Sequence, residues 1–300
     1  MLDRLGAMPG VEFVIWAPGD AALAQPVDLL VLPYLTTHDT LSGLDPALVS
    51  LVQAQMLGFD GVEAALPEGI TYCNAVGVHE VPSAELAVAL ALAAQRGLTA
   101  FAQAQLAGGW DRPLLPGLAG SRVLLIGVGG VGREIEKRIL PFDVTLTKVG
   151  RTARAGVHAK SELASLLPDA EVVILAVPLG AGTTHLADAA FLAAMKPGAL
   201  LVNISRGAVV DTDALVDRVA SGALRAALDV VDPEPLPVGH PLWMLPGVTL
   251  TPHIGGNVLS MPQRIDPLVV TQISRLRDGL PPLHVVFDGR TLAPSSPVKS

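Results

Sequence analysis

One stretch constrains the fold of this chain more than any other: residues 123–140, VLLIGVGGVGREIEKRIL. It reads as a strand, a glycine-rich turn marked by Gly127, Gly129 and Gly132, and a helix. In a dinucleotide-binding βαβ unit the first glycine permits the tight turn, the second lets the backbone approach a pyrophosphate, and the third lets the helix pack against the strand. The helix N-terminus then presents free N–H groups to the anion. The stretch predicts a nucleotide-binding domain; a turn without a ligand and a methyltransferase-type loop are the alternatives.

Short apolar runs alternate with helical stretches along most of the chain. We expect strands at residues 11–16, 28–32, 48–55, 123–126, 144–149, 172–177, 200–204, 226–230 and 248–251, and helices at 133–140, 161–167 and 211–220. Two longer helices are expected at 84–95, with Ser83 as N-cap, and at about 260–277, where Pro267 should bend or delay the helix. Strands that alternate with helices form parallel sheets, so the predicted fold class is α/β. The chain then divides into a dinucleotide-binding domain, residues 84–264, and a discontinuous second domain, residues 1–83 and 265–300.

Composition narrows the functional classes. Half of the 300 residues are hydrophobic and the net charge is -8, so we expect two domains with sizeable cores and no nucleic-acid footprint. Cys73 is the single cysteine, which rules out an intramolecular disulfide and favours the cytoplasm. The start, MLDRLGAMPG, lacks the apolar region of a signal peptide, and the longest apolar run, residues 86–94, is shorter than the roughly 20 residues that cross a bilayer. No membrane association is expected.

The segment after the next strand departs from the usual dinucleotide pattern. An acid about 20 residues beyond the glycine loop normally binds the ribose 2′-hydroxyl of NAD. Residues 148–154 instead read KVGRTAR, without an acid. Arg151 can form a forked pair with phosphate oxygens, and Thr152 can donate a hydrogen bond. The segment therefore favours NADP(H), with its 2′-phosphate, over NAD; a solvated basic loop is the alternative.

Four further motifs follow in order: LLVNISRGAVVDTDAL at 200–215, ALDVVDPEPLP at 227–237, HPLW at 240–243 and LTPHIGG at 250–256. With the glycine loop they resemble the D-2-hydroxyacid dehydrogenase family, and within it the NADP-using glyoxylate/hydroxypyruvate reductases. The resemblance extends from about residue 48 to 286. It implies a Rossmann-type, doubly wound parallel-sheet domain inserted into a smaller flavodoxin-like α/β substrate domain, and it implies a homodimer.

The resemblance also implies a role for individual residues. The catalytic residues would be Arg206, Glu234 and His253, and no metal is implied. The substrate would bind to backbone N–H groups near Leu57 and Gly58, to Arg206 and to His253. Asp229 would hold the nicotinamide carboxamide, and Gly150 stands where the family usually has its ribose-binding acid. The full set implied for the cofactor, NADP or alternatively NAD, is Gly127, Gly129, Gly130, Val131, Gly132, Gly150, Arg151, Thr152, Val177, Pro178, Ile204, Ser205, Asp229, His253 and Gly255.

These residue types suit the reduction of a 2-oxo acid, which moves a hydride to the keto carbon and a proton to its oxygen. An arginine fork such as Arg206 can hold the carboxylate and polarise the ketone. Histidine is the side chain best suited to donate a proton near neutral pH, which fits His253. A carboxylate beside it, Glu234, favours the imidazolium and fixes the ring.

Several alternatives stay open. Formate dehydrogenases carry glutamine where this chain has Glu234, and a phosphorylated substrate would need basic residues, which the segments 33–37 and 55–62 lack. A small 2-oxo acid, such as glyoxylate or hydroxypyruvate, is therefore expected. Some relatives use this fold as a nucleotide-sensing corepressor, which is a binding module and not an enzyme. Tyr34 could line the pocket or pack at the surface, and Trp110 and Trp243 are interpreted as packing or dimer-contact residues. The six histidines other than His253 are interpreted as structural.

Overall fold

The computed structural model describes residues 1–18, 23, 25–36, 38–289 and 291–294. The chain forms two compact units: Met1–His79 with Leu259–Ser300, and Glu80–Val258. The boundaries thus lie at 79/80 and 258/259, a few residues before the expected 83/84 and 264/265. Both units are α/β, and the second is the larger.

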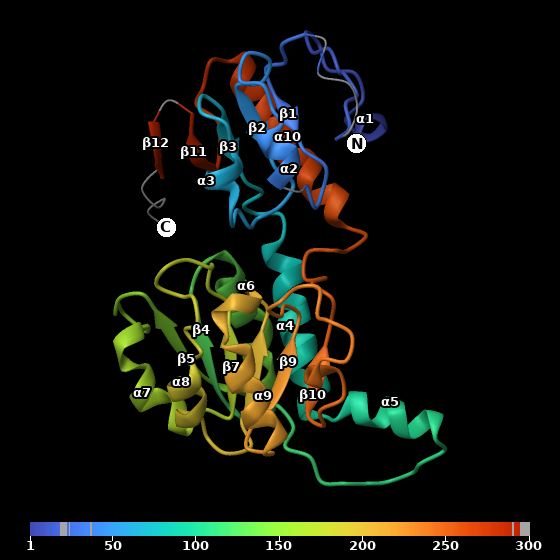
Figure 1. Cartoon of the computed structure of the whole chain (residues 1–300), viewed down its shortest axis with the longest axis vertical. Helices are drawn as coiled ribbons and strands as arrows, with labels where there is room; N and C mark the ends of the chain where they lie inside the picture. Colours follow the sequence, from blue (N-terminus) through green and yellow to red (C-terminus); the bar gives the residue numbers. More distant parts are fainter. Residues whose placement is uncertain (19–22, 24, 37, 290, 295–300) are drawn as a thin grey trace. The chain divides into compact units, whose positions relative to one another are not determined.

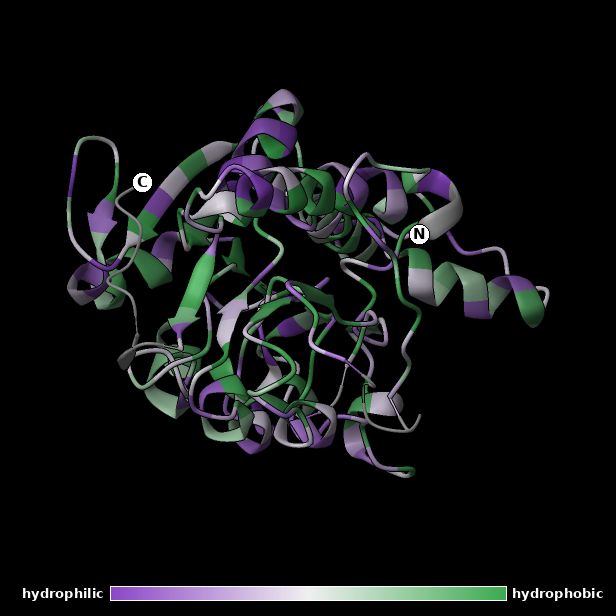
Figure 2. Cartoon of the chain, turned by 90° about the horizontal axis from the view of Figure 1, so that it is seen from above, coloured by the Kyte–Doolittle hydropathy of each residue, from purple (hydrophilic) through white to green (hydrophobic). Residues whose placement is uncertain are grey.

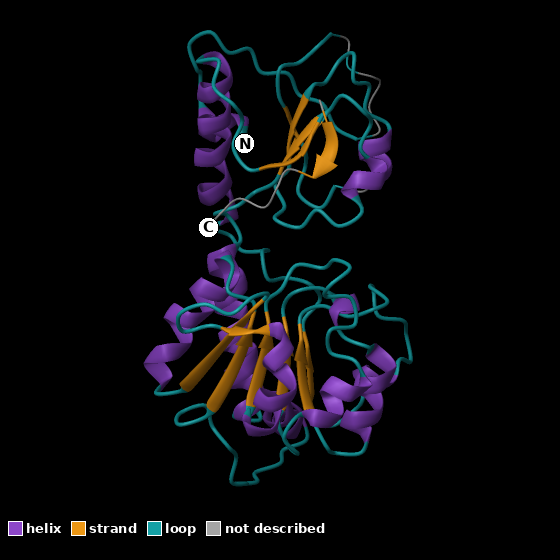
Figure 3. Ribbon diagram, turned by 90° about the vertical axis from the view of Figure 1, so that its left-hand side faces the viewer, coloured by secondary structure: helices purple, strands orange, loops and turns teal. Residues whose placement is uncertain are grey.

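The larger unit contains a seven-stranded sheet in which every pairing is parallel, in the order β10-β9-β8-β7-β4-β5-β6 (Figures 1 and 3). Its strands are β4 (Arg122–Ile126), β5 (Thr145–Gly150), β6 (His158–Ala159), β7 (Val172–Leu175), β8 (Leu200–Asn203), β9 (Arg225–Leu228) and β10 (Val248–Leu250). Its helices are α4 (Glu80–Gln95), α5 (Leu98–Leu106), α6 (Gly130–Ile139), α7 (Leu163–Leu166), α8 (Ala189–Ala194) and α9 (Thr212–Ala220). The chain order reverses between β4 and β7, which is the switch point of a doubly wound sheet, where such folds bind ligands.

Hydrophobic side chains on both faces of this sheet explain its burial. Alternate residues of β4 point to opposite sides: Leu124 and Ile126 pack with α7, α8 and α9, whereas Val123 and Leu125 pack with α4 and α6. Strands covered on both faces carry continuous apolar runs, as the sequence of β7 and β8 does. Figure 2 shows hydrophobic residues along the strands and mixed colours on the surrounding helices.

The smaller unit has a mixed sheet in the order β1-β2-β3-β11-β12. Strands β1 (Leu30–Val31), β2 (Leu51–Gln53) and β3 (Thr71–Cys73) are parallel, and β11 (Val285–Asp288) and β12 (Thr291–Pro294) are antiparallel additions. The helices of this unit are α1 (Leu2–Leu5), α2 (His38–Ser42), α3 (Val62–Ala65) and α10 (Met261–Arg277). Leu32, Val52, Ile70 and Tyr72 are among the residues buried in its core.

Three expectations about local structure were wrong. Residues 11–16 form no strand; Val14 and Ile15 lie exposed there, and the segment pairs with no other strand of the described chain. Helix α4 begins at Glu80, so Ser83 lies inside it and is not its N-cap. Pro82 does not prevent this start, because the first turn of a helix needs no N–H from proline. Helix α10 begins at Met261 and continues through Pro267, so the proline does not delay the helix, and the alternative expectation of a bend stays a prediction; Ile265 and Val269 on either side of the proline are buried.

Among the described residues, no single helix is long and apolar enough to cross a membrane. Helices α4 and α5, which meet at an angle of 62°, pass such a test only when taken together, by length and composition. Half of the residues of α4, eight of sixteen, are buried, and five of these belong to the hydrophobic core of the larger unit.

Candidate cofactor and catalytic site

The candidate site residues of the larger unit follow the carboxyl ends of its strands. Because all these strands are parallel, their carboxyl ends meet at one edge of the sheet. The hydrogen-bond ladder continues past the strands and fixes the first residues beyond them: Gly127 donates to Val149, Ala176 to Ile126, Asp229 to Asn203 and Thr251 to Leu228. The loops that carry the expected cofactor and catalytic residues therefore start from rigid positions.

The glycine loop has the geometry that a dinucleotide requires. Gly127 has a φ of 108°, and a Cβ on it would collide with the backbone carbonyl of Ala176. A Cβ on Gly132 would collide with the carbonyl of Gly127, so this glycine lets α6 pack against the loop. A Cβ on Gly129, by contrast, would meet nothing within 4 Å. Open space in front of Gly129, at the N-terminus of α6, is the arrangement that fits a pyrophosphate.

Two further positions of this loop are set by their neighbours. A Cβ on Gly130 would lie 2.7 Å from Cγ of Glu80, the buried first residue of α4, so a larger residue could enter only if Glu80 moved. Val131 is half-buried and packs against the core that α4 and α6 share. The loop thus joins the two helices on this face of the sheet.

The segment that would contact the adenosine ribose starts at Gly150, the last residue of β5. A Cβ there would lie 3.2 Å from Cγ1 of Val157 and 3.3 Å from Cγ2 of Val128, which is tighter than an ordinary contact. Arg151 and Thr152 follow on an exposed turn. Many NAD-binding proteins have an acid at this position. This chain has a glycine there, and the neighbouring side chains leave little room for a larger residue.

The loop after β7 carries Val177 and Pro178. The hydroxyl of Thr183 donates to the carbonyl oxygen of Pro178 at 2.6 Å, and Thr183 and Thr184 close the turn at Gly180. Val177 packs against the hydrophobic core beside α8 and α9. This loop lies next to the glycine loop, since Ala176 contacts Gly127.

Arg206 is placed by a tight turn after β8. The buried side chain of Asn203 accepts hydrogen bonds from the N–H and hydroxyl of Ser205, at 3.0 and 2.7 Å, and donates to the carbonyl of Arg206 at 3.0 Å. A Cβ on Gly207 would collide with the carbonyl of Val231, so the chain can turn here only with glycine. Ile204 and Ser205, both expected at the cofactor, belong to the same turn.

Asp229, directly after β9, is buried and holds the turn that carries His253. Its Oδ1 accepts from the Thr251 hydroxyl at 2.6 Å and from the N–H of Ile254 at 2.9 Å, and its Oδ2 accepts from the N–H of Gly255 at 2.9 Å. A carboxylate offers about four acceptor positions. The turn fills three of these positions. The fourth, on Oδ2, is compatible with the expected contact with the nicotinamide carboxamide.

His253 and Glu234 lie together. Nδ1 of His253 is 2.6 Å from Oε1 of Glu234, and about two fifths of each side chain is exposed. The pair comes from two loops that are 19 residues apart in sequence, one after β9 and one after β10. Because Nδ1 is occupied by the carboxylate, Nε2 is the ring nitrogen available to a ligand.

The other expected residues lie elsewhere. Leu57 and Gly58 belong to the smaller unit, in the loop after β2. In the same unit Tyr34 stacks on His79, with ring centroids 5.6 Å apart. Trp110 is 83% exposed, so packing within the chain does not explain it, and Trp243 is half-exposed with its Nε1 bonded to the Pro237 carbonyl.

Sequence reasoning missed the polar residues that support the site. Asn203 and Thr251 shape the turns of Arg206 and His253, but a buried asparagine and a threonine at strand ends carry no distinctive pattern. Asn74 was missed for the same reason; its amide donates to the carbonyl of Leu57 at 2.8 Å. One signal was available for Asn203. It is the polar last residue of an apolar strand, and the carboxyl end of such a strand is where a parallel sheet binds its ligand.

The glycine loop at the switch point of a parallel sheet, followed by an arginine and a histidine–glutamate pair at the same edge, defines the class of nicotinamide-dinucleotide-binding oxidoreductases. Comparison with known proteins agrees. Residues 88–255, more than half of the chain, match the family model described as "D-isomer specific 2-hydroxyacid dehydrogenase, NAD binding domain". The chain belongs to the D-isomer specific 2-hydroxyacid dehydrogenase family.

Individual relatives include enzymes with different substrates. The chain is 33% identical to a glyoxylate reductase from Thermofilum pendens over 84% of this chain and 79% of that protein. It is also 33% identical to a D-3-phosphoglycerate dehydrogenase from Methanocaldococcus jannaschii, over 73% of this chain and 43% of that protein. The structure is similar to that of a D-isomer specific 2-hydroxyacid dehydrogenase from Xanthobacter autotrophicus Py2 in complex with NADPH and MES, with a TM-score of 0.77, 28% identity, and coverage of 94% of this chain and 92% of that chain.

Proposed function

We propose that the chain reduces a small 2-oxo acid, such as glyoxylate or hydroxypyruvate, to the D-2-hydroxy acid with NADPH. The observation that carries this proposal is the His253–Glu234 pair, which follows β9 and β10 at the sheet edge where Arg206 and the glycine loop also lie. A binding protein has no need of a proton donor and its orienting carboxylate at this position. The pair therefore favours an enzyme over a nucleotide-sensing corepressor.

Each residue has a defined task in the proposed reaction. The nicotinamide, when bound, supplies the hydride. Arg206 binds the substrate carboxylate and polarises the ketone. His253 donates the proton to the ketone oxygen from Nε2, since Glu234 accepts from Nδ1 and fixes the orientation of the ring. Asp229 keeps the His253 turn in place and has an acceptor position left for the carboxamide.

The preference for NADPH rests on the segment after β5. Arg151 and Thr152 are exposed and available to a 2′-phosphate, and no acid stands at residues 150–154 to repel it. NAD is the alternative cofactor. Replacing Arg151 with alanine should raise the KM for NADPH about 10- to 100-fold, the loss expected for a charge-assisted hydrogen bond, and leave the KM for NADH unchanged. Equal kcat/KM with both cofactors in the parent protein would contradict the preference.

The choice of a small substrate rests on the loops of the smaller unit. Residues 33–37 and 55–62 contain no lysine or arginine, and Thr37 lies outside the described residues. A phosphorylated substrate would need such a cation. This is why we favour glyoxylate or hydroxypyruvate, although phosphoglycerate dehydrogenases are among the relatives.

The test is a substrate panel in which NADPH oxidation is followed with glyoxylate, hydroxypyruvate, pyruvate and 3-phosphohydroxypyruvate. We expect turnover of the first two, and product of D configuration. Arg206→Lys keeps the charge but loses the planar fork, so kcat/KM should fall with NADPH binding retained. Tight NADPH binding without turnover of any 2-oxo acid would favour the corepressor-like alternative.

We further propose that the chain forms a homodimer through α5 and the segment that follows it. Helix α5 has no buried residue, and large apolar side chains nearby are exposed: Leu106, Trp110 and Leu114. Exposed apolar surface of this kind marks a protein interface. A cytoplasmic location stays a prediction.

A further inference from the structure

Glu80 is a buried acidic residue that has no task in the proposed reaction. It is the first residue of α4 and is 7% exposed. Helix α4 lies beside α6 on one face of the large sheet, and the two helices share a hydrophobic core (Figure 1). An acidic side chain is seldom buried to this degree unless nearby charges or dipoles stabilise it. The groups that stabilise Glu80 therefore lie in the protein around it.

The side chain of Glu80 reaches the start of α6, where the glycine loop ends. A Cβ on Gly130, the first residue of α6, would lie 2.7 Å from Cγ and 3.1 Å from Oε1 of Glu80. Glu80 thus lies at the N-termini of two helices, its own and α6. The positive ends of both helix dipoles favour a carboxylate over a neutral carboxyl group there. We therefore expect a negative charge directly beside the glycine loop.

The pyrophosphate of a dinucleotide would bind at the same helix end. The first N–H groups of a helix have no acceptor within the helix, and those of α6 begin beside the open space at Gly129. A pyrophosphate is an anion, so a carboxylate beside its site repels it. Because Glu80 is buried, salt and water screen this repulsion less than they would at the surface. Glu80 and the cofactor therefore compete for the positive end of the same helix.

We propose that Glu80 weakens the binding of the nicotinamide dinucleotide and thereby speeds the release of the cofactor. The pyrophosphate is common to NADPH and NADH and to their oxidised forms, so the repulsion acts on all of them alike. The oxidised cofactor must leave before the next turnover, and in many enzymes product release limits kcat. A cofactor that is bound less tightly dissociates faster. This role of Glu80 requires only that the chain binds a dinucleotide, whichever substrate it reduces.

Two variants remove the charge and keep the length of the side chain. Glu80→Gln and Glu80→Met should each lower the Kd for NADPH and for NADH about tenfold, the scale of repulsion between charges several ångströms apart at the effective dielectric constant of a protein. The rate constant for NADPH dissociation, measured by stopped-flow fluorescence, should fall by a similar factor. A gain in Glu80→Gln alone would indicate a new N–H contact with the phosphate and would overturn the proposal.

Fragments of the cofactor locate the effect. ADP contains a pyrophosphate, whereas adenosine 2′-monophosphate contains none. In both Glu80 variants the Kd for ADP should fall as it does for NADPH, and the Kd for adenosine 2′-monophosphate should stay at the parent value. Isothermal titration calorimetry measures both constants without turnover. An equal gain for the two fragments would contradict the proposal, because it would show a general change of the domain and not the loss of repulsion at the pyrophosphate.

Glu85 provides the matched control. It lies on the same helix and is exposed, and Glu85→Gln makes the same change in net charge, so its Kd for NADPH should equal that of the parent. Glu80→Asp keeps the charge but withdraws it from Gly130, and its Kd should lie between those of the parent and Glu80→Gln. A Kd for NADPH that is unchanged or higher in both Glu80→Gln and Glu80→Met would refute the proposal, as would an equal gain in Glu85→Gln.

Discussion

His253 adopts a backbone conformation that few residues other than glycine adopt, with a φ of 53°. Such a conformation is retained only where surrounding contacts impose it. Here the N–H of His253 donates to the Asp229 carbonyl at 2.7 Å, and the next two N–H groups donate to the Asp229 carboxylate. The turn thus aims the ring at Glu234 independently of any ligand.

This arrangement predicts that substitutions of His253 and Glu234 lower kcat without weakening the binding of NADPH. His253→Ala removes the proposed proton donor and should lower kcat at least about 100-fold, the scale of lost general acid catalysis, with the Kd for NADPH retained. Glu234→Gln keeps a hydrogen-bond partner for the ring but not its charge, so the loss of kcat should be smaller. Steady-state kinetics and a fluorescence titration of NADPH measure the two effects. Substantial turnover by His253→Ala would remove this residue from the mechanism.

Gly150 leads to a prediction about cofactor choice. An acid here would repel a 2′-phosphate, but its Cβ would press on Val157 and Val128 at 3.2 and 3.3 Å. Gly150→Asp alone should therefore lower kcat/KM with NADPH by about tenfold or more and gain little with NADH. Adding Val157→Ala makes room for the carboxylate and should raise kcat/KM with NADH. Val157→Ala alone is the control and should keep the parent's ratio; a single Gly150→Asp variant that already prefers NADH would contradict the steric argument.

At the scale of elements, the long apolar strands could be predicted from the sequence, whereas the pairing of a strand and the presence of a short strand could not. The runs that became β4, β7 and β8 were identified within one or two residues of their observed ends, because strands buried on both faces are apolar throughout. Residues 11–16 have the same apolar character but form no strand, since pairing depends on a partner that a single segment does not specify. The short strand β3 was missed, because its three residues show too little pattern.

In the candidate site, the motif residues could likewise be predicted from the sequence, whereas the contacts that hold their turns could not. Arg206, Glu234 and His253 were identified from motifs, and the structure brings His253 to within 2.6 Å of Glu234. The turn-forming contacts of Asn203 and Asp229 depend on which backbone groups are left unpaired after the strands end. Local sequence does not encode that, so these contacts become visible only in three dimensions.

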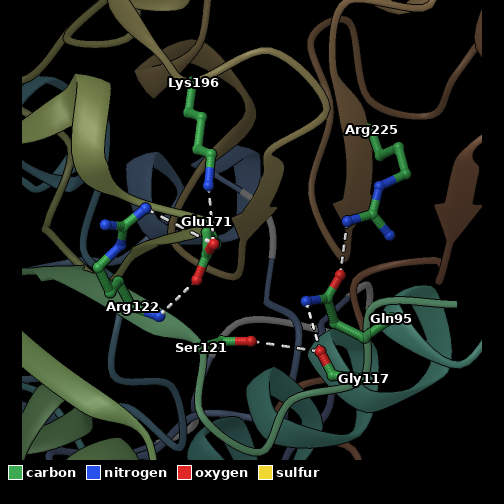
Figure 4. A network of polar contacts seen from close by, with 7 residues as sticks. All are labelled: Gln95, Gly117, Ser121, Arg122, Glu171, Lys196 and Arg225. Carbon is green, nitrogen blue, oxygen red and sulfur yellow. Dashed lines mark hydrogen bonds and ion pairs between the residues drawn. The ribbon is translucent and has the colours of Figure 1, made fainter.

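The edge of the large sheet opposite the site contains a polar network that joins several elements (Figure 4). The Arg225 guanidinium, at the start of β9, donates to Gln95 at the end of α4 at 2.5 Å, to the Ala94 carbonyl at 3.2 Å and to the Gly198 carbonyl at 3.2 Å. Burial lowers the pKa of Arg225 from its ordinary value, and the three acceptors replace part of the water that the guanidinium loses. Gln95 in turn donates to Gly117, where the chain returns after α5.

Arg225→Met should therefore lower the free energy of unfolding by about 1–3 kcal/mol, because it leaves the side-chain oxygen of the buried Gln95 without its donor. Arg122→Met is the matched control: Arg122 is about half-exposed and lies 3.6 Å from Glu171, so its loss should cost about 1 kcal/mol or less. Urea titration of both variants gives the comparison. An Arg225→Met protein as stable as the parent would show that the network contributes little.

At the scale of the whole molecule, most of the expected site residues belong to one of the two units. The glycine loop, Arg206, Asp229 and the His253–Glu234 pair all lie within Glu80–Val258, whereas Leu57 and Gly58 belong to the unit formed by the two ends of the chain. Variants of the glycine loop should therefore change cofactor binding, whereas variants of Arg206 in the same unit should change kcat/KM for the substrate with cofactor binding retained.

We expect two copies of the chain to associate through α5 and the segment after it. Leu106, Trp110 and Leu114 are 91%, 83% and 102% exposed on α5 and the segment after it. Leaving these side chains in water costs free energy that burial against a second copy would recover. Light scattering should give twice the chain mass of 31.0 kDa for the parent protein. Leu106→Glu combined with Trp110→Glu should give the monomer mass, because each added charge would have to be buried unpaired. Val238 is a comparably exposed apolar residue in the loop after β9, and Val238→Glu should leave the dimer intact. A parent protein that runs as a monomer, or a double variant that still dimerises, would refute this interface.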